Sequence, residues 1–333
     1  MMKNILLIYT GGTIGMQKDP VEKSLKAVDF SKLTSSIPEL QNSEIQVHHT
    51  SIKQVIDSSN MNKKYWIEIA EIIERNYSEM DGFVVLHGSD TMAYSASALS
   101  FMLEGLQKAV IFTGSQIPIG ARRTDAKENL ITSIEIAASG KIKEVCVYFE
   151  DKLLRGNRTV KVNSEQFEAF NSPNFPTLAD VGINIKYNKR NFYKSEKESL
   201  KVYTKLSEDI AVLKLFPGIS EKVVSAILNS ANNIIIETFG AGNATNRKWF
   251  LKLLENAIEA GKCIVNCSQC LAGEVTQGKY ETSSELHKIG IISANDMTTE
   301  TAITKLMFLD GLCDTTEEKK SLFIKPLRGE ISN

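Results

Sequence analysis

Near its N-terminus the chain reads Ile5-Leu6-Leu7-Ile8-Tyr9-Thr10-Gly11-Gly12-Thr13-Ile14-Gly15, an apolar run that leads into a glycine-rich turn. A short continuous apolar run is typical of a parallel strand buried on both faces of a sheet. The turn then lies at the carboxyl end of that strand, where open α/β sheets bind ligands. Glycine lets a backbone approach a ligand closely, and this turn presents the hydroxyl of Thr13.

A second run and turn of the same kind follows, Gly82-Phe83-Val84-Val85-Leu86-His87-Gly88-Ser89-Asp90-Thr91-Met92. Ser89 and Asp90 fall between the predicted strand and a predicted helix, and the N–H groups that begin a helix favour anions. Asp90 also fits a plain helix cap. This motif therefore predicts either a second group of catalytic side chains or a capped helix.

In the rest of the N-terminal half, short apolar runs typical of strands alternate with segments whose apolar residues recur at helical spacing. Further strands are predicted at 45–49, 110–112 and 145–149, and helices at 62–77, at 92–106 and from Thr124 to Gly140. The repeated βα order predicts a doubly wound, mostly parallel sheet. Residues 16–33 show no clear periodicity and are predicted to form a mobile loop.

The alternation fails from 163 to 209, where Asn, Pro, Lys and Ser are frequent and a crossover hairpin and linker are expected. A second α/β unit follows, with strands predicted at 210–215, 234–239 and 263–267. Its helices are expected to begin near Ser220, Thr245 and Thr298. We therefore predict two α/β domains: a larger one at 1–190 carrying the nucleophile, a linker at 191–209, and a smaller parallel-sheet domain at 210–333.

Composition narrows the function classes. The chain has 333 residues and a formal net charge of −1, which predicts no nucleic-acid or acidic-membrane partner. No apolar run approaches a membrane span, and no cleavage site follows the N-terminal run, so we expect neither a membrane anchor nor a signal peptide. The cysteine count of 5 is odd, which favours a reducing compartment. Cys263, Cys267 and Cys270 are expected in an apolar strand and its loop rather than at a metal.

Three interpretations of the first turn remain open. The first is a nucleotide-binding loop, although the turn departs from the dinucleotide spacing Gly-x-Gly-x-x-Gly and lacks the ending of a phosphate-binding loop. It could be a purely structural turn. It could also expose Thr13 as a nucleophile beside backbone N–H groups that stabilise an oxyanion. The nucleophile would need a base, and the pattern leaves open whether that base is His87, which is as compatible with a buried structural role, or one of the lysines.

Both motifs together resemble the signatures of the bacterial-type L-asparaginase family, in the same order. The resemblance continues through most of the chain, in Asp57-Ser58-Ser59-Asn60-Met61, Gly114-Ser115-Gln116-Ile117-Pro118, Arg155-Gly156-Asn157-Arg158-Thr159-Val160-Lys161, Gly240-Ala241-Gly242-Asn243 and Leu327-Arg328-Gly329-Glu330. Without a signal peptide, the chain is most similar to the cytoplasmic type I branch. The resemblance implies hydrolysis of L-asparagine without a metal or cofactor, by a homodimer or homotetramer.

The resemblance also implies roles for individual residues. Thr13 would be the nucleophile, and Ser89, Asp90 and Lys161 would complete the catalytic set. Substrate binding is implied for Asp57, Ser58, Ser59 and Ser115, together with Ser89 and Asp90.

Three departures from the family are visible. Family members commonly have a Tyr in the loop after the first motif, whereas Leu25 stands about there in this chain. Ser89 replaces the usual Thr. Glu237 stands where some type I members have an effector-site Arg, so we do not expect that regulation.

The missing Tyr leaves the group that activates Thr13 open. Asp19, Glu22 and Asp29 are the candidate bases within the loop itself. We expect none of them to act as the base.

Other functions also remain open. One is a glutaminase, and another is the related tRNA-dependent amidotransferase subunit, which carries an additional N-terminal domain and for which this chain offers no basic surface. The third is a non-catalytic amino-acid-binding regulator. The joint presence of Thr13, Ser89, Asp90 and Lys161 argues against the regulator.

Overall fold

The computed structural model describes residues 2–18, 25–27, 44–276 and 281–332. Contacts between residues divide the chain into two units. The first comprises 1–172 and 176–204, and the second comprises 173–175 and 205–333. The domain boundaries expected from the sequence, with a linker at 191–209, stay predictions.

The first unit is built on an eight-stranded sheet. Its strands lie in the order β13 (Ile185–Tyr187), β12 (Ala179–Val181), β9 (Lys152–Arg155), β8 (Val145–Phe149), β7 (Val110–Thr113), β5 (Gly82–Leu86), β1 (Lys3–Gly11) and β4 (Ile45–Ile56). Neighbours from β8 to β4 run parallel, and β9, β12 and β13 pair antiparallel. The predicted α/β class and parallel-dominated sheet are confirmed, and the predicted crossover segment supplies the β12–β13 hairpin.

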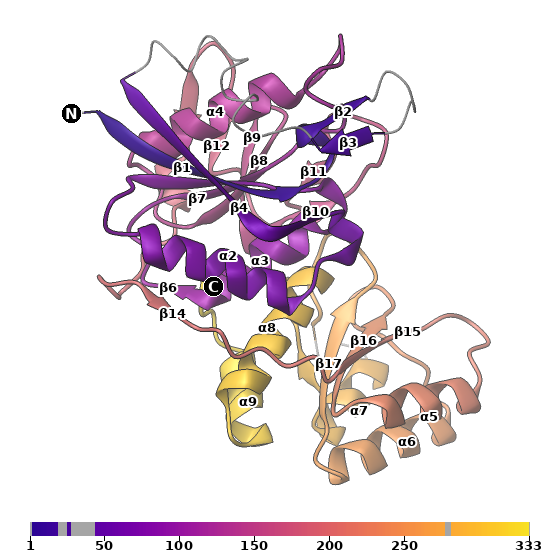
Figure 1. Ribbon diagram of the computed structural model, residues 1–333. Coiled ribbons are helices and arrows are strands. Elements are labelled where there is room, and N and C mark those ends of the chain that lie inside the picture. The colour runs from indigo at the N-terminus through magenta and orange to yellow at the C-terminus, as the bar shows by residue number, and fades with distance from the viewer. Residues whose placement is uncertain (1, 19–24, 28–43, 277–280, 333) are drawn as a thin grey trace. The chain divides into compact units, whose positions relative to one another are not determined.

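Helices cover both faces of this sheet. Figure 1 shows α4 (Ala126–Ala138) on one face and α2 (Lys63–Asn76) with α3 (Met92–Met102) on the other. Asn62 begins α2 by accepting the N–H of Lys64. The prediction that α3 continues to residue 106 is wrong, because Leu103 leaves helical geometry and β6 (Leu103–Glu104) pairs with β14 (Lys201–Val202) instead.

The segment after the first glycine turn is only partly described. Within the segment 16–33, which was predicted to be a mobile loop, β2 (Met16–Lys18) and β3 (Leu25–Ala27) form an antiparallel ladder. Cross-strand hydrogen bonds therefore form a ladder in a segment whose sequence shows no regular spacing of apolar residues. Asp19, Glu22 and Asp29 lie outside the described residues.

The second unit contains a sheet of four parallel strands, in the order β15 (Ile210–Lys214), β16 (Asn233–Thr238), β17 (Cys263–Ser268) and β18 (Ile292–Ser293). In Figure 1 one face carries α5 (Glu221–Ser230), α6 (Lys248–Glu259) and α7 (Glu281–Ile289), and the other carries α8 (Thr299–Leu312) and α9 (Thr316–Phe323). This confirms the smaller parallel-sheet unit. The elements α7, β18 and α9 were not predicted from the sequence.

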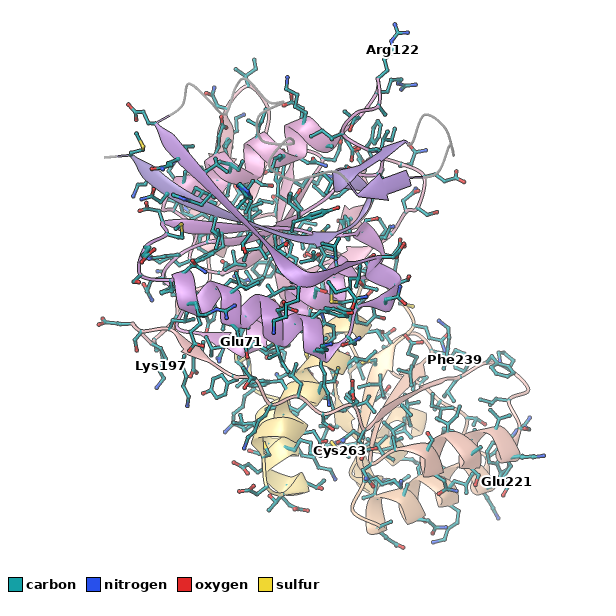
Figure 2. The ribbon with its side chains drawn as sticks, viewed as in Figure 1. Glu71, Arg122, Lys197, Glu221, Phe239 and Cys263 are labelled. Atoms are coloured by element: carbon teal, nitrogen blue, oxygen red, sulfur yellow. The ribbon has the colours of Figure 1, made fainter. Side chains whose placement is uncertain are left out.

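The cysteines lie as expected for an apolar strand and its loop. Cys263 and Cys267 are buried in β17 and Cys270 is exposed. Figure 2 shows Cys263 among core side chains, whereas Glu221 projects outward from α5. Within 2–18, 25–27, 44–276 and 281–332, no group of three or more His, Cys, Asp or Glu side chains could hold a metal ion. Over the same ranges, no helix is both long and apolar enough to cross a bilayer.

Candidate active site

The two glycine turns meet at the carboxyl edge of the first unit's sheet. β1 and β5 are parallel neighbours, with Tyr9 opposite Leu86. Gly12 has φ of +87°, and a Cβ added there would lie 2.5 Å from both Cα and N of Gly88. Only a residue without a side chain permits this approach and this backbone conformation. The contact therefore brings the turn that carries Thr13 against the turn that carries Ser89.

Thr13 begins a 3₁₀ turn, η1 (Thr13–Gly15), and is partly exposed. Its hydroxyl makes no hydrogen bond to any residue that the structure describes. Such a hydroxyl at a strand end is accessible to a substrate, as a nucleophile has to be.

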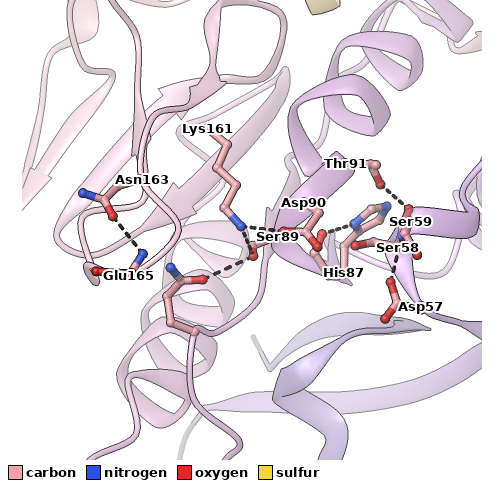
Figure 3. Close-up of polar contacts among 12 residues, drawn as sticks. Asp57, Ser58, Ser59, His87, Ser89, Asp90, Thr91, Lys161, Asn163 and Glu165 are labelled. Carbon is pink, nitrogen blue, oxygen red and sulfur yellow. Dashed lines mark hydrogen bonds and ion pairs between the residues drawn. The ribbon is translucent and has the colours of Figure 1, made fainter.

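The centre of the site is a contact between residues far apart in the sequence. Ser89 and Asp90 form the turn η4 (Ser89–Thr91), and Lys161 lies in β10 (Val160–Lys161), which pairs with β11 (Phe170–Asn171). The Lys161 ammonium donates to Ser89 Oγ at 2.8 Å and to Asp90 Oδ1 at 2.7 Å. Figure 3 shows Lys161 reaching both side chains. The Lys161 side chain is 17 % exposed and that of Asp90 is 67 % exposed.

A second hydrogen bond of Ser89 involves Gln116, which the sequence analysis did not single out. Ser89 Oγ donates to Gln116 Oε1 at 3.2 Å, and Gln116 Nε2 donates to the carbonyl of Gln166 at 3.1 Å. The backbone of Gln116 is held by Asp125, which precedes α4 and accepts its N–H at 2.9 Å. No local pattern signals this contact, because Ser89 and Gln116 are distant in sequence.

The turn η3 (Ser58–Asn60) packs beside η4. Ser58 is 5 % exposed, and its carbonyl accepts the Thr91 hydroxyl at 2.7 Å. A Cβ added at Gly88 would lie 2.5 Å from Ser58 Oγ. Asp57 Oδ1 accepts the N–H of Ser59 at 2.9 Å, and this hydrogen bond lowers the pKa of Asp57. Asp57 is thus the cap of η3, and Ser59 is exposed beside it (Figure 3).

Ser115 follows the last residue of β7 by two positions, at the same edge of the sheet. It is 3 % exposed, and its hydroxyl has no hydrogen-bond partner among the described residues. A buried hydroxyl without a partner is costly, so it is suited to a ligand that supplies one.

His87 does not take part in a Ser-His-Asp arrangement. It is 1 % exposed, its Nδ1 lies 2.7 Å from the carbonyl oxygen of Gly88, and its Nε2 lies 2.8 Å from Ser95 Oγ. Burial lowers its pKa to about 4, so the ring is neutral near pH 7. Of the two interpretations of His87, the buried, hydrogen-bonded one is therefore correct.

Comparison with known proteins agrees with this geometry. The family model "Asparaginase, N-terminal" matches residues 4–193, and "Glutaminase/Asparaginase C-terminal domain" matches 209–323. L-asparaginase 1 of Escherichia coli (strain K12) is 40 % identical, over 99 % of this chain and 98 % of that protein. The 60 kDa lysophospholipase of Mus musculus is 39 % identical over 99 % of this chain, which spans only 63 % of that protein.

A solved structure matches over the full length. L-asparaginase I from Vibrio cholerae O1 biovar eltor str. N16961 is 41 % identical, with a TM-score of 0.91 and coverage of 100 % of both chains. Both family models match in order and together cover most of the sequence. The chain therefore belongs to the asparaginase family.

Proposed function

We propose that this protein hydrolyses L-asparagine to L-aspartate and ammonia, with Thr13 as the nucleophile. The observation that carries the proposal is the contact of Lys161 with both Ser89 and Asp90, at the edge of the sheet where Thr13 lies. Membership of the asparaginase family supports the same reaction.

In the proposed reaction, Thr13 Oγ attacks the carbon of the side-chain amide and its proton passes to a base. The new O–C bond forms as negative charge develops on the amide oxygen, and backbone N–H groups of the turns stabilise that oxyanion. The C–N bond then breaks, ammonia leaves with a proton, and water hydrolyses the acyl-enzyme.

Lys161 is the proposed proton carrier. Its nitrogen lies 2.8 Å from Ser89 Oγ. In the proposed relay, bound substrate brings the hydroxyls of Thr13 and Ser89 together, and Thr13 gives its proton to Ser89 Oγ. Ser89 turns its own proton from Gln116 to an unprotonated Lys161, which later returns it to the leaving amine. Asp90 holds the ammonium form of Lys161 in place between transfers.

Substrate binding is proposed from the charges of the site. An amino acid presents one ammonium and one carboxylate, and the exposed carboxylate of Asp90 suits the ammonium. The hydroxyls of Ser58 and Ser59 suit the carboxylate. The partnerless hydroxyl of Ser115 supplies a further hydrogen bond. Asp57 would act mainly by fixing the Ser59 backbone.

We further propose a cytoplasmic homodimer or homotetramer that needs no metal or cofactor and binds neither nucleic acid nor membrane. Its support is the similarity to type I asparaginases and the near-zero net charge. A glutaminase activity is the closest alternative, since the C-terminal family model covers glutaminases as well.

Release of ammonia and L-aspartate from L-asparagine by the purified protein tests the proposal. Lys161→Met should lower kcat/KM by about 10²–10⁴-fold, the usual contribution of a proton-transferring residue. Lys194→Met is the matched control, because Lys194 is exposed and forms no hydrogen bond or ion pair with any described residue. An inactive wild type, or equal activity of the two variants, would contradict the proposal.

A further inference from the structure

A buried chain of hydrogen bonds ends at the peptide group beside the proposed nucleophile. Trp66 Nε1 of α2 lies 2.8 Å from Ser95 Oγ of α3, and Ser95 Oγ lies 2.8 Å from His87 Nε2. His87 Nδ1 lies 2.7 Å from the carbonyl oxygen of Gly88. Figure 3 shows His87 beside Ser89 and Asp90. Ser95 is fully buried and Trp66 is 6 % exposed, so protein rather than solvent determines these bonds.

The donors and acceptors of this chain are fixed by chemistry. The Gly88 carbonyl only accepts, so the proton of His87 lies on Nδ1. The Trp66 indole only donates, so Ser95 accepts from it and donates its own proton to Nε2. The ring is thus neutral with its proton on Nδ1, and the carbonyl of Gly88 points toward the interior.

The orientation of that carbonyl determines where the next N–H points. The peptide bonds of the described residues are trans, and in a planar trans peptide the C=O and N–H point in opposite directions. The N–H of Ser89 therefore points away from His87. Ser89 is partly exposed beside Lys161, and its N–H has no acceptor among the described residues.

Gly88 makes such a restraint necessary. A side chain there would meet Ser58 Oγ at 2.5 Å, so the packing of the two turns requires glycine. Glycine, however, is the residue whose flanking peptide groups reorient most easily. An oxyanion donor works only if its direction is fixed before the reaction.

We propose that His87 is a positioning residue, which holds the Gly88–Ser89 peptide so that the Ser89 N–H faces the substrate as an oxyanion donor. This inference rests on the proposed function. In this role His87 touches neither substrate nor nucleophile and acts only through the Gly88 carbonyl.

Two amide substitutions separate this role from simple core packing. The amide nitrogen of His87→Asn takes the place of Nδ1 and can still donate to Gly88, whereas that of His87→Gln takes the place of Nε2 and reaches only Ser95. We expect His87→Gln to lower kcat by about 10²-fold with little change in KM, since losing one oxyanion donor costs about 10²–10³-fold. His87→Asn should retain at least about ten times more kcat than His87→Gln. If His87 only fills space, the larger Gln should be the better substitute.

The unmodified protein provides a readout that does not depend on activity. In ¹⁵N-labelled wild type, the NMR signals of His87 should report a neutral ring protonated at Nδ1. A proton on Nε2 would overturn the inference even if neither variant folds. If wild type is active and both variants fold, a kcat of His87→Gln equal to or above that of His87→Asn would overturn the role of His87 and leave the proposed function standing. An inactive wild type would instead overturn the proposed function.

Discussion

Lys161 is the residue on which the candidate site most depends, because its ammonium contacts a hydroxyl and a carboxylate at once. Asp90 is 67 % exposed, so the ion pair adds at most about 1 kcal/mol to stability, and the role proposed for it is catalytic. The motifs alone made Thr13, Ser89 and Asp90 candidate site residues, beside the alternatives of a structural turn and a helix cap. Only the family resemblance selected Lys161 among the lysines, since no local pattern encodes a contact across 72 residues.

His87 gives a pH dependence whose sign follows from its burial. Burial lowers the pKa of His87 from 6.5 to about 4, whereas in the unfolded chain it keeps the ordinary value. Between about pH 4 and pH 6.5 the unfolded state therefore binds more protons than the folded state. The stability contributed by neutral His87 is fully present above pH 6.5 and is lost as the pH falls through about 4, amounting to about 3 kcal/mol.

This linkage can be measured by denaturant unfolding of wild type and His87→Asn across this pH range. The free energy of unfolding of wild type, relative to the variant, should fall by about 3 kcal/mol on acidification. A difference that does not change with pH would refute the buried, neutral state.

At the scale of elements, the site is made by strand ends and the turns that follow them. β1, β5, β7 and β8 were predictable because strands buried on both faces appear as continuous apolar runs. The pairs β2–β3 and β6–β14 were not, since strands of two or three residues have too few positions to show a period. The strand β14 is also distant in sequence from β6. The helix α9 was missed because most of its residues are polar and only Lys319 and Phe323 are buried.

Substitution of Gly12 tests how closely the two turns must approach. Gly12→Ala combines an unfavourable φ of +87° with a Cβ 2.5 Å from the backbone of Gly88, so we expect kcat to fall at least about tenfold as Thr13 and Ser89 separate. Gly140→Ala is the control, because Gly140 has φ of +65° but no atom within 4 Å of the added Cβ. It should cost about 1–2 kcal/mol of stability and leave kcat unchanged. Equal activities of the two variants would show that the close approach is unimportant.

At the scale of the whole molecule, each unit has its own sheet and its own buried core. All the proposed catalytic and substrate-binding residues belong to the first unit. The two-unit α/β architecture was predictable from the alternation of apolar periods. The hydrogen bonds that Gln116 and Ser95 form were not predictable, because they depend on tertiary packing that a single sequence does not display.

The choice between asparagine and glutamine is a property of the complete site. Glutamine is longer by one methylene, and a site sized for asparagine should disfavour it by about 1–3 kcal/mol, or roughly 10- to 200-fold in kcat/KM. We expect asparagine to be preferred, measured for both amides at one pH. Parity, or a preference for glutamine, would favour the glutaminase alternative.

Ammonia release from L-asparagine by Thr13→Ala tests whether Thr13 is the nucleophile. Thr13 is partly exposed and its hydroxyl bonds no described residue, so the variant should fold and unfold as wild type does. Thr13→Ser, which keeps the hydroxyl, serves as the control and should retain measurable turnover. We predict that Thr13→Ala has the wild-type circular dichroism spectrum and releases no ammonia above background. A folded Thr13→Ala protein with turnover near that of wild type would show that Thr13 is not the nucleophile.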